Sequence, residues 1–296
     1  MATSTQPRIG VETKSGAGSR DRIAGPFGMA ALYGVLGLAA VVALFPFYYM
    51  LVMSTQRSAE ILNVPPPLFF GTSLVQNYTE LLAALPFWAA MFNSFAIAAI
   101  HTLLVLFFCS LGGYGFSKFH FPGRNALFGF LLATLMVPAF VGLIPSFVIM
   151  GRLGWLNTWN PLIIPGIANA FGIFWMRQYI DSAIPNDLMD AARIDGAHEF
   201  GVYIKIILPV IMPALAALAI LTFMGKWNDF QWPLLILKDA EKYTLPVALS
   251  TLRSLRGNEI GVQVLGSTMA IVPILLVFIA SSRQFIAGIT AGAVKA

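Results

Sequence analysis

Residues 181–208 read DSAIPNDLMDAARIDGAHEFGVYIKIIL and separate two apolar segments, at about 161–180 and 209–237. Each segment is long enough to cross a bilayer, because a hydrocarbon core of ~30 Å needs about 20 helical residues. Within 181–208, small, charged and apolar residues recur at helical spacing and are followed by Gly196. The pattern predicts a short helix, a glycine turn and a second helix that leads back into the membrane.

The composition is that of a membrane protein. Hydrophobic residues make up 58% of the 296 residues and charged residues only 10%, whereas a soluble domain carries roughly 25% charged residues. Six apolar runs are long enough to span a bilayer, at about 29–53, 91–115, 125–151, 161–180, 209–237 and 262–286. The expected fold class is therefore an all-α membrane protein with six transmembrane helices.

Basic residues predict the orientation of these spans. An even number of spans puts both termini on one side of the membrane. The N-terminal tail, the loops 116–124 and 181–208 with the flanking Arg177, and the C-terminal end hold eleven Lys and Arg, against six in the other loops. Because basic loops stay in the cytoplasm, we expect both termini and residues 181–208 to be cytoplasmic.

The spans divide the chain into four parts. Residues 1–28 are polar and lack the apolar core of a signal peptide, so we expect a disordered cytoplasmic tail. The first transmembrane helix and its outer loop follow. A five-helix core and a short cytoplasmic C-terminal tail complete the chain. The boundaries of the last three parts are 29–90, 91–288 and 289–296.

The sequence contains none of the common catalytic motifs. It has no Gly-x-x-x-x-Gly-Lys-[Ser/Thr] nucleotide-binding loop, no paired carboxylates, no nucleophile with a histidine and no metal-ligand cluster. The chain has a single cysteine, Cys109, so no disulfide can form within it. Cys109 lies in an apolar run, where we expect a buried, inert thiol. We expect no catalytic residue, metal or cofactor here. The net charge of +5 comes from scattered residues that form no track for nucleic acid.

Residues 181–208 suit contact with another protein. Pro185 can open a helix, because its missing N–H costs nothing in the first turn, and Gly196 permits a turn with positive φ. The alternative is an amphipathic helix on the inner leaflet. The five carboxylates between Asp181 and Glu199 oppose it, because that leaflet is anionic. Four residues fall near one predicted face at helical spacing: Leu188, Ala191, Ala192 and Asp195.

The fifth apolar run contains Lys226-Trp227-Asn228-Asp229. An ionised group at the bilayer centre costs about 2.5–3.5 kcal/mol, so we expect this cluster near the outer mouth or facing a watery cavity. Lys226 and Asp229 are three residues apart and can neutralise each other. The alternative is interfacial anchoring by Trp227 and Trp232. The candidates for a solute path are Asn93, Trp227, Asn228 and Asp229.

The run from Asp190 to Pro209 resembles the "EAA" loop of ABC importer permeases, which reads Glu-Ala-Ala, three residues, Gly, nine residues and Ile-x-Leu-Pro. Asp190 replaces the Glu and Gly196 is in register. Shorter stretches, such as 227–235 and the tail 288–295, resemble the carbohydrate-importing branch, specifically the smaller membrane subunit of maltose-type importers. The resemblance covers roughly residues 28–296.

This resemblance implies a type I ABC importer permease fold with a cytoplasmic coupling helix, in the bacterial inner membrane. The implied docking residues for an ATPase are Leu188, Asp190, Ala191, Ala192, Asp195, Gly196 and Ala197. The tail residues Gly292, Ala293, Val294 and Lys295 are implied to reach the ATPase subunits.

The resemblance also implies partners and a cargo. The partners are a second homologous permease subunit, a dimer of ABC ATPase subunits that binds ATP and Mg, an external substrate-binding protein and the lipid bilayer. The cargo is a mono- or oligosaccharide, with glycerol phosphate or another small polar solute as the alternative. A secondary transporter would show inverted repeats and charges within its spans that couple transport to ions. Five of the six spans lack interior charges, and neither half of the sequence resembles the other.

Overall fold

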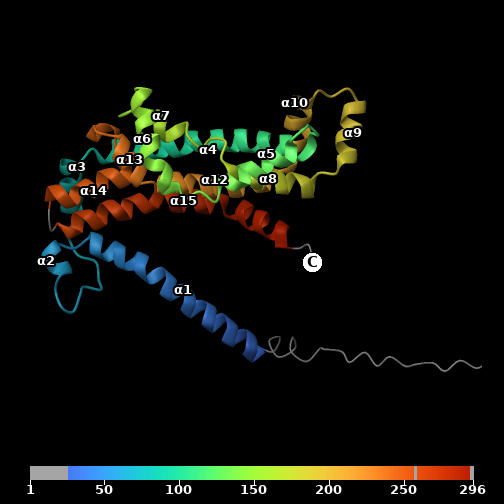
Figure 1. Ribbon diagram of the computed structural model, residues 1–296. Coiled ribbons are helices and arrows are strands. Elements are labelled where there is room, and N and C mark those ends of the chain that lie inside the picture. Colours follow the sequence, from blue (N-terminus) through green and yellow to red (C-terminus); the bar gives the residue numbers. More distant parts are fainter. Residues whose placement is uncertain (1–25, 257–258, 294–296) are drawn as a thin grey trace, which may run out of the picture. The chain divides into compact units, whose positions relative to one another are not determined.

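The computed structural model describes residues 26–256 and 259–293, and all regular elements in these residues are helices (Figure 1). The chain forms two compact units, Met1–Leu51 and Val52–Ala296. Most of the predicted tail 1–28 lies outside the described residues, as do Val294 and Lys295.

The first helix, α1 (Pro26–Ser54), is continuous and apolar around its whole circumference. It contains no Asp, Glu, Lys or Arg over its 29 residues. A helix of this length that is apolar on all faces is typical of a membrane span. The described span, Gly28–Ser54, agrees with the predicted span 29–53.

Two further helices are long and apolar enough to cross a membrane without interruption: α4 (Phe87–Lys118) and α15 (Ile260–Ala293), in which the apolar span is Ile260–Ile279. They agree with the predicted spans 91–115 and 262–286. The segment between α1 and α4 contains the short helices α2 (Ser58–Ile61) and α3 (Leu74–Ala84).

The other three predicted spans are broken, so the structure does not confirm six uninterrupted helices. The third consists of α5 (Arg124–Thr134), the 3₁₀ turn η1 (Ala139–Gly142) and α6 (Leu143–Arg152). Pro138 is extended before η1 and interrupts the helix, since proline lacks an N–H. The fourth consists of α7 (Asn160–Ile163) and α8 (Ala170–Ala183).

The fifth span is bent as well as broken. The helical segments Glu199–Val210 and Met212–Trp227 meet at 78°, beside two prolines that remove backbone donors. With this pair counted as one span, up to four spans meet the length and hydropathy criteria in the described residues. The bent segment contains α10 (Glu199–Val202), the π-helical η2 (Tyr203–Ile207), α11 (Leu208–Val210) and α12 (Met212–Trp227). Next come α13 (Gln231–Ile236), η3 (Ala240–Lys242) and α14 (Leu245–Arg256).

Helices α4 and α8 pack closely because glycine lies at their interface. A Cβ on Gly113 would lie 2.7 Å from the Met176 Cβ, and one on Gly172 would lie 2.6 Å from the Cys109 Sγ. Small residues of this kind let membrane helices approach each other. Cys109 is buried in the same core, as expected for an inert thiol.

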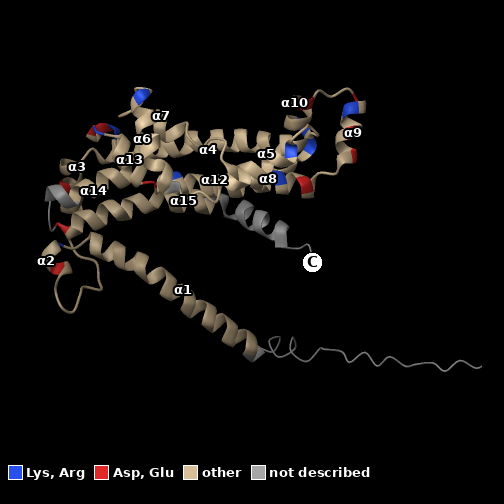
Figure 2. Cartoon of the chain, viewed as in Figure 1, with Lys and Arg blue, Asp and Glu red and all other residues tan. Residues whose placement is uncertain are grey.

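Charged residues of the unit 52–296 gather at two ends (Figure 2). One group lies around α9 (Asn186–Ile194), α10 and the start of α5, and the other lies near α2, α3 and α13. The region between them is almost entirely uncharged. An apolar band between two charged ends is the pattern expected of a chain that crosses a bilayer.

Candidate functional site

The polar stretch 181–208 forms the predicted helix, turn and helix. Pro185 is the N-cap of α9, with φ −61° and ψ 148°, and the helix begins at Asn186. At the next helix, His198 is the N-cap of α10, and its Nδ1 accepts a hydrogen bond from the Gly201 N–H at 3.0 Å.

Gly196 ends α9 in the left-handed region, with φ of 79°, as predicted. The Gly196 N–H donates to the Arg193 carbonyl and the Ala197 N–H donates to the Ala192 carbonyl, both at 3.0 Å. This pair of bonds is the Schellman motif, which terminates a helix and turns the chain.

Helix α9 has a buried face and an exposed face. Met189 and Ala192 are 2% and 7% exposed and belong to the core that includes α4 and α8. Leu188 is 43% exposed and Ile194 is 86% exposed. We expected Ala192 on the docking face, but it lies inside, because it is three residues from Met189 and completes the same apolar stripe. The other predicted docking residues are exposed: Leu188, Asp190, Ala191, Asp195, Gly196 and Ala197.

Hydrogen bonds and ion pairs join the exposed loop to α4. The Tyr114 hydroxyl donates to the Glu199 Oε2 at 2.7 Å. The other carboxylate oxygen of Glu199 lies 2.8 Å from the Arg193 Nε, and the Arg193 Nη1 lies 3.3 Å from the Asp190 Oδ1. The membrane helix α4 and the surface helix α9 are therefore linked through one carboxylate.

A second contact fixes the start of α9. The Lys118 ammonium donates to the Ile184 carbonyl at 2.6 Å and to the Asn186 Oδ1 at 3.1 Å. Sequence reasoning did not identify Tyr114, Lys118 or Glu199 as site residues. Tyr114 and Glu199 are 85 residues apart, and no local pattern indicates such a contact.

The polar cluster of the fifth span lies where α12 gives way to α13. The Lys226 Nζ and Asp229 Oδ2 are 3.6 Å apart, so the two charges face each other as predicted. Trp227 is buried in the protein core, where it stacks on Phe223. Asn228 is exposed, and its amide donates to the Met224 carbonyl at 2.9 Å.

Asn93, the remaining candidate for the path, is buried and holds a loop. Its amide donates to the carbonyls of Glu241 and Tyr243 at 2.8 and 3.1 Å. The neighbouring Ser94 hydroxyl accepts a hydrogen bond from the Leu245 N–H at 2.7 Å. These two side chains therefore fix the start of α14 against α4.

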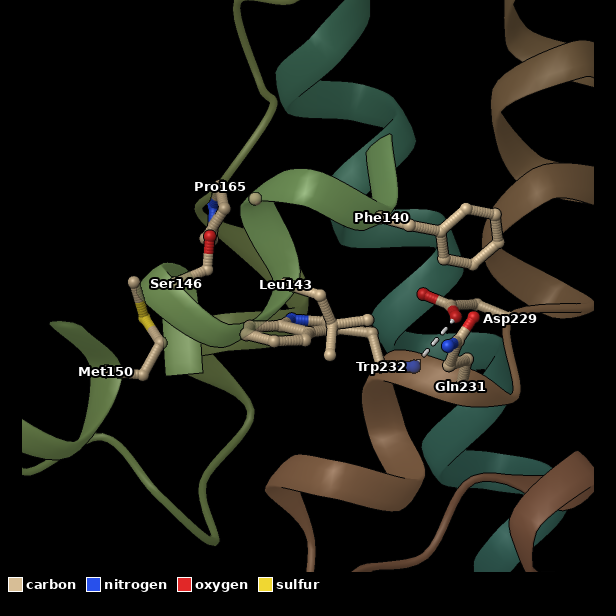
Figure 3. Close-up of a pocket in the computed structure, with 9 residues that line it drawn as sticks. Phe140, Leu143, Ser146, Met150, Pro165, Asp229, Gln231 and Trp232 are labelled. Carbon is tan, nitrogen blue, oxygen red and sulfur yellow. Dashed lines mark hydrogen bonds between the residues drawn. The ribbon is translucent and has the colours of Figure 1, made fainter. Parts of the chain in front are cut away.

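Two cavities share Asp229. The first, of about 310 Å³, lies between α6 and the start of α13 (Figure 3). The second, of about 440 Å³, lies among α4, α8 and α12. Among the four predicted path residues, Asp229 lines both cavities. The first is lined by Phe140, Gly142, Leu143, Ser146, Met150, Pro165, Asp229, Gln231 and Trp232. The second is lined by His101, Asn169, Phe171, Leu218, Leu221, Thr222, Gly225, Lys226 and Asp229.

Within the described part of the chain, no three His, Cys, Asp or Glu residues come together in a way that could hold a metal ion. Gly292 and Ala293 form the end of α15. The other two predicted tail residues, Val294 and Lys295, lie outside the described residues.

Long apolar helices around cavities that contain a paired lysine and aspartate define a helical membrane protein. The chain belongs to the family described as "Binding-protein-dependent transport system inner membrane component", which matches residues 110–289.

Curated relatives match most of the chain. The arabinooligosaccharide transport permease AraQ of Halalkalibacterium halodurans is 39% identical over 259 residues, covering 86% of this chain and 92% of that protein. The lactose transport permease LacG of Rhizobium radiobacter is 38% identical, covering 89% and 95%. The sn-glycerol-3-phosphate transport permease UgpE of Salmonella typhi is 31% identical, covering 86% and 92%.

A solved structure has the same fold. It is the crystal structure of a bacterial ABC transporter involved in the import of the acidic polysaccharide alginate. The similarity has a TM-score of 0.75 at 27% identity, and it covers 90% of this chain and 97% of the matched chain.

Proposed function

We propose that this chain is the membrane-spanning permease subunit of an ATP-driven importer of mono- or oligosaccharides. The observation that carries the proposal is the arrangement of α9. This helix has an exposed face, ends at the Gly196 turn and is linked to α4 through Glu199. A small exposed helix of this kind can occupy a groove on a separate motor subunit, and its attachment to α4 would carry motion into the membrane.

The cargo follows from the relatives. The permeases named for arabinooligosaccharides and lactose are 36–39% identical to this chain, whereas those named for glycerol phosphate are 31% identical. A sugar is therefore the better supported cargo, and glycerol phosphate remains the second candidate.

The proposed assembly contains a second, homologous permease, a dimer of ABC ATPases that binds ATP and Mg, and an external binding protein. The family description, which names dependence on a binding protein, supports the last of these. We place α9 and both termini in the cytoplasm of the bacterial cell, because basic residues predominate on that side. The C-terminal residues from Gly292 to Lys295 would approach the ATPase subunits.

The docking role of α9 can be tested with charge substitutions on its exposed face. Leu188→Glu and Ile194→Glu place a carboxylate in the proposed interface without disturbing the buried Met189. Leu153, which is also exposed but lies in the loop after α6, provides the control variant Leu153→Glu. The measurements are co-purification of the ATPase subunits and ATP-driven sugar uptake in proteoliposomes.

Loss of ATPase binding and uptake in both α9 variants, with the Leu153 control unaffected, is the expected result. Uptake that proceeds without ATP or without an ATPase subunit would instead identify a secondary transporter. Undiminished ATPase binding by both α9 variants would remove this helix from the interface.

A further inference from the structure

Each of the three interrupted spans contributes one break to the two cavities; in the fifth span it is the second break, which follows the bend described above. Phe140 belongs to the η1 turn of the third span, and Pro165 and Asn169 lie in the break between α7 and α8. Asp229 lies in the break between α12 and α13. Non-helical backbone is stable at membrane depth only where protein buries it or where it lines a watery cavity. Discontinuous helices in transporters commonly surround the solute.

The charges of the cavity linings cancel. Among the described side chains that line the two cavities, Lys226 and Asp229 are the only Lys, Arg, Asp or Glu residues, and they are paired at 3.6 Å. The His101 Nδ1 lies 2.7 Å from the Ile163 carbonyl, so this nitrogen carries a proton and donates. Among the described lining residues, no lysine or arginine is therefore left without a carboxylate partner to neutralise an incoming anion.

We propose that the larger cavity, among α4, α8 and α12, is a binding site for one ring of an uncharged sugar. This subunit would then contribute to the substrate specificity of the importer. The inference rests on the proposed function and narrows its cargo. An anion in this cavity would lose its hydration without gaining a counter-charge, and such burial is strongly unfavourable. A neutral sugar needs only hydrogen bonds.

The lining offers the chemistry that a sugar ring requires. Thr222, Lys226 and Asp229 offer polar groups for the hydroxyl rim, and Phe171 supplies an aromatic ring for the C–H side. The Asn169 amide, which already bonds the Gly166 carbonyl and the Gly172 N–H, retains one further N–H to donate. The volume of about 440 Å³ falls within the range of roughly 300–1,000 Å³ that is usual for small-molecule sites.

Gly225 leaves part of this cavity open. It lies on α12, and a Cβ built there would have no atom within 4 Å. A larger side chain at this position therefore starts in open space at the wall of the cavity. Gly129 of α5 is likewise open and is absent from both linings, so it offers a matched control.

Binding can be measured on the whole importer in nanodiscs, without the external binding protein, by saturation-transfer-difference NMR. The probes are D-galactose and D-galacturonate, which share a ring and differ in charge, together with L-arabinose, D-glucose, lactose and glycerol 3-phosphate. We expect signals from neutral sugars and none from the two anions. Gly225→Phe should abolish the signals, whereas Gly129→Phe should leave them unchanged.

Two milder variants keep the test valid if Gly225→Phe fails to assemble. Thr222→Val removes one hydroxyl and should weaken neutral-sugar binding about 3–10-fold, while Thr268→Val on α15 should not. Asp229→Asn frees the charge of Lys226 and should admit galacturonate at the expense of galactose.

The outcomes distinguish failure of the proposed sugar site from failure of the proposed importer function. Absence of signal from every neutral sugar, or anion signals as strong as the neutral ones, would overturn the site. So would Gly225→Phe and Thr222→Val variants that bind neutral sugars like the wild type. If ATP-driven sugar uptake persists in proteoliposomes under any of these results, the importer function stands. If the wild type moves no sugar in that assay, the proposed cargo itself is wrong.

Discussion

A graded series at Gly196 tests whether the turn after α9 is needed for coupling to an ATPase. A left-handed conformation costs a residue other than glycine about 1–2 kcal/mol, which corresponds to a factor of about 5–30 in the population of the turn. No atom lies within 4 Å of a Cβ built at Gly196, so the penalty comes from the backbone and not from a clash. Transport should therefore fall with the conformational penalty, least for Gly196→Asn, further for Ala and most for Val.

The assay is ATP-driven sugar uptake per reconstituted transporter, with substrate-stimulated ATPase activity measured on the same preparation. Gly154 provides the matched control, because its φ is 69° and its Cβ position is equally open, yet it lies in the loop after α6. Equal losses in the Gly154 and Gly196 series would show general destabilisation and refute the reasoning. Wild-type uptake by Gly196→Val would refute it more directly.

Three other predictions concern the contacts around these sites. Tyr114→Phe removes the hydrogen bond to Glu199. Because a hydrogen bond contributes about 0.5–1.5 kcal/mol, the amount of sugar moved per ATP should fall a few-fold. Tyr33→Phe on α1 is the control. Gly113→Ala should destabilise the purified protein by about 1–3 kcal/mol through overpacking, as measured by denaturation, whereas Gly115→Ala, with open space around its Cβ, should not. The Lys242 ammonium and the Asn157 amide hold the pKa of Asp239 below its usual range, so the contribution of this carboxylate to stability is present at neutral pH and is lost as pH falls through the lowered pKa. Asn157→Ala should shift that loss to higher pH in melting curves, and identical curves for the two proteins would contradict the assignment.

Local chemistry explains the features that could be predicted from the sequence. Pro185 restricts the backbone angle φ and Gly196 permits a positive φ, so their residue types alone indicated where α9 starts and ends. Lys226 and Asp229 are three residues apart on a helical pattern, and their pairing follows from that spacing. In each case, the residues that determine the feature lie within one or two helical turns of it in the sequence.

Features that depend on contacts between distant segments could not be predicted. Hydropathy measures the composition of residues 125–151 but not their continuity, and so it missed the interruption before η1. Asn93 looked like a polar residue facing a path, because its partners at Glu241 and Tyr243 lie about 150 positions away in the chain. The contact between Tyr114 and Glu199 was missed for the same reason.

Helices α4 and α8 connect the two candidate sites. Helix α4 carries His101 at the larger cavity and Lys118 at the start of α9, and α8 begins beside that cavity and ends just before Ile184. Their backbones approach closely at Gly113, where an added Cβ would lie 2.8 Å from the Arg177 nitrogen, and we expect a displacement of α9 to move both helices together. If this pair transmits the motion, Gly113→Ala should reduce sugar uptake per ATP hydrolysed while leaving neutral-sugar binding in the cavity intact. Equal losses of binding and of coupling would show that the substitution had damaged the fold instead.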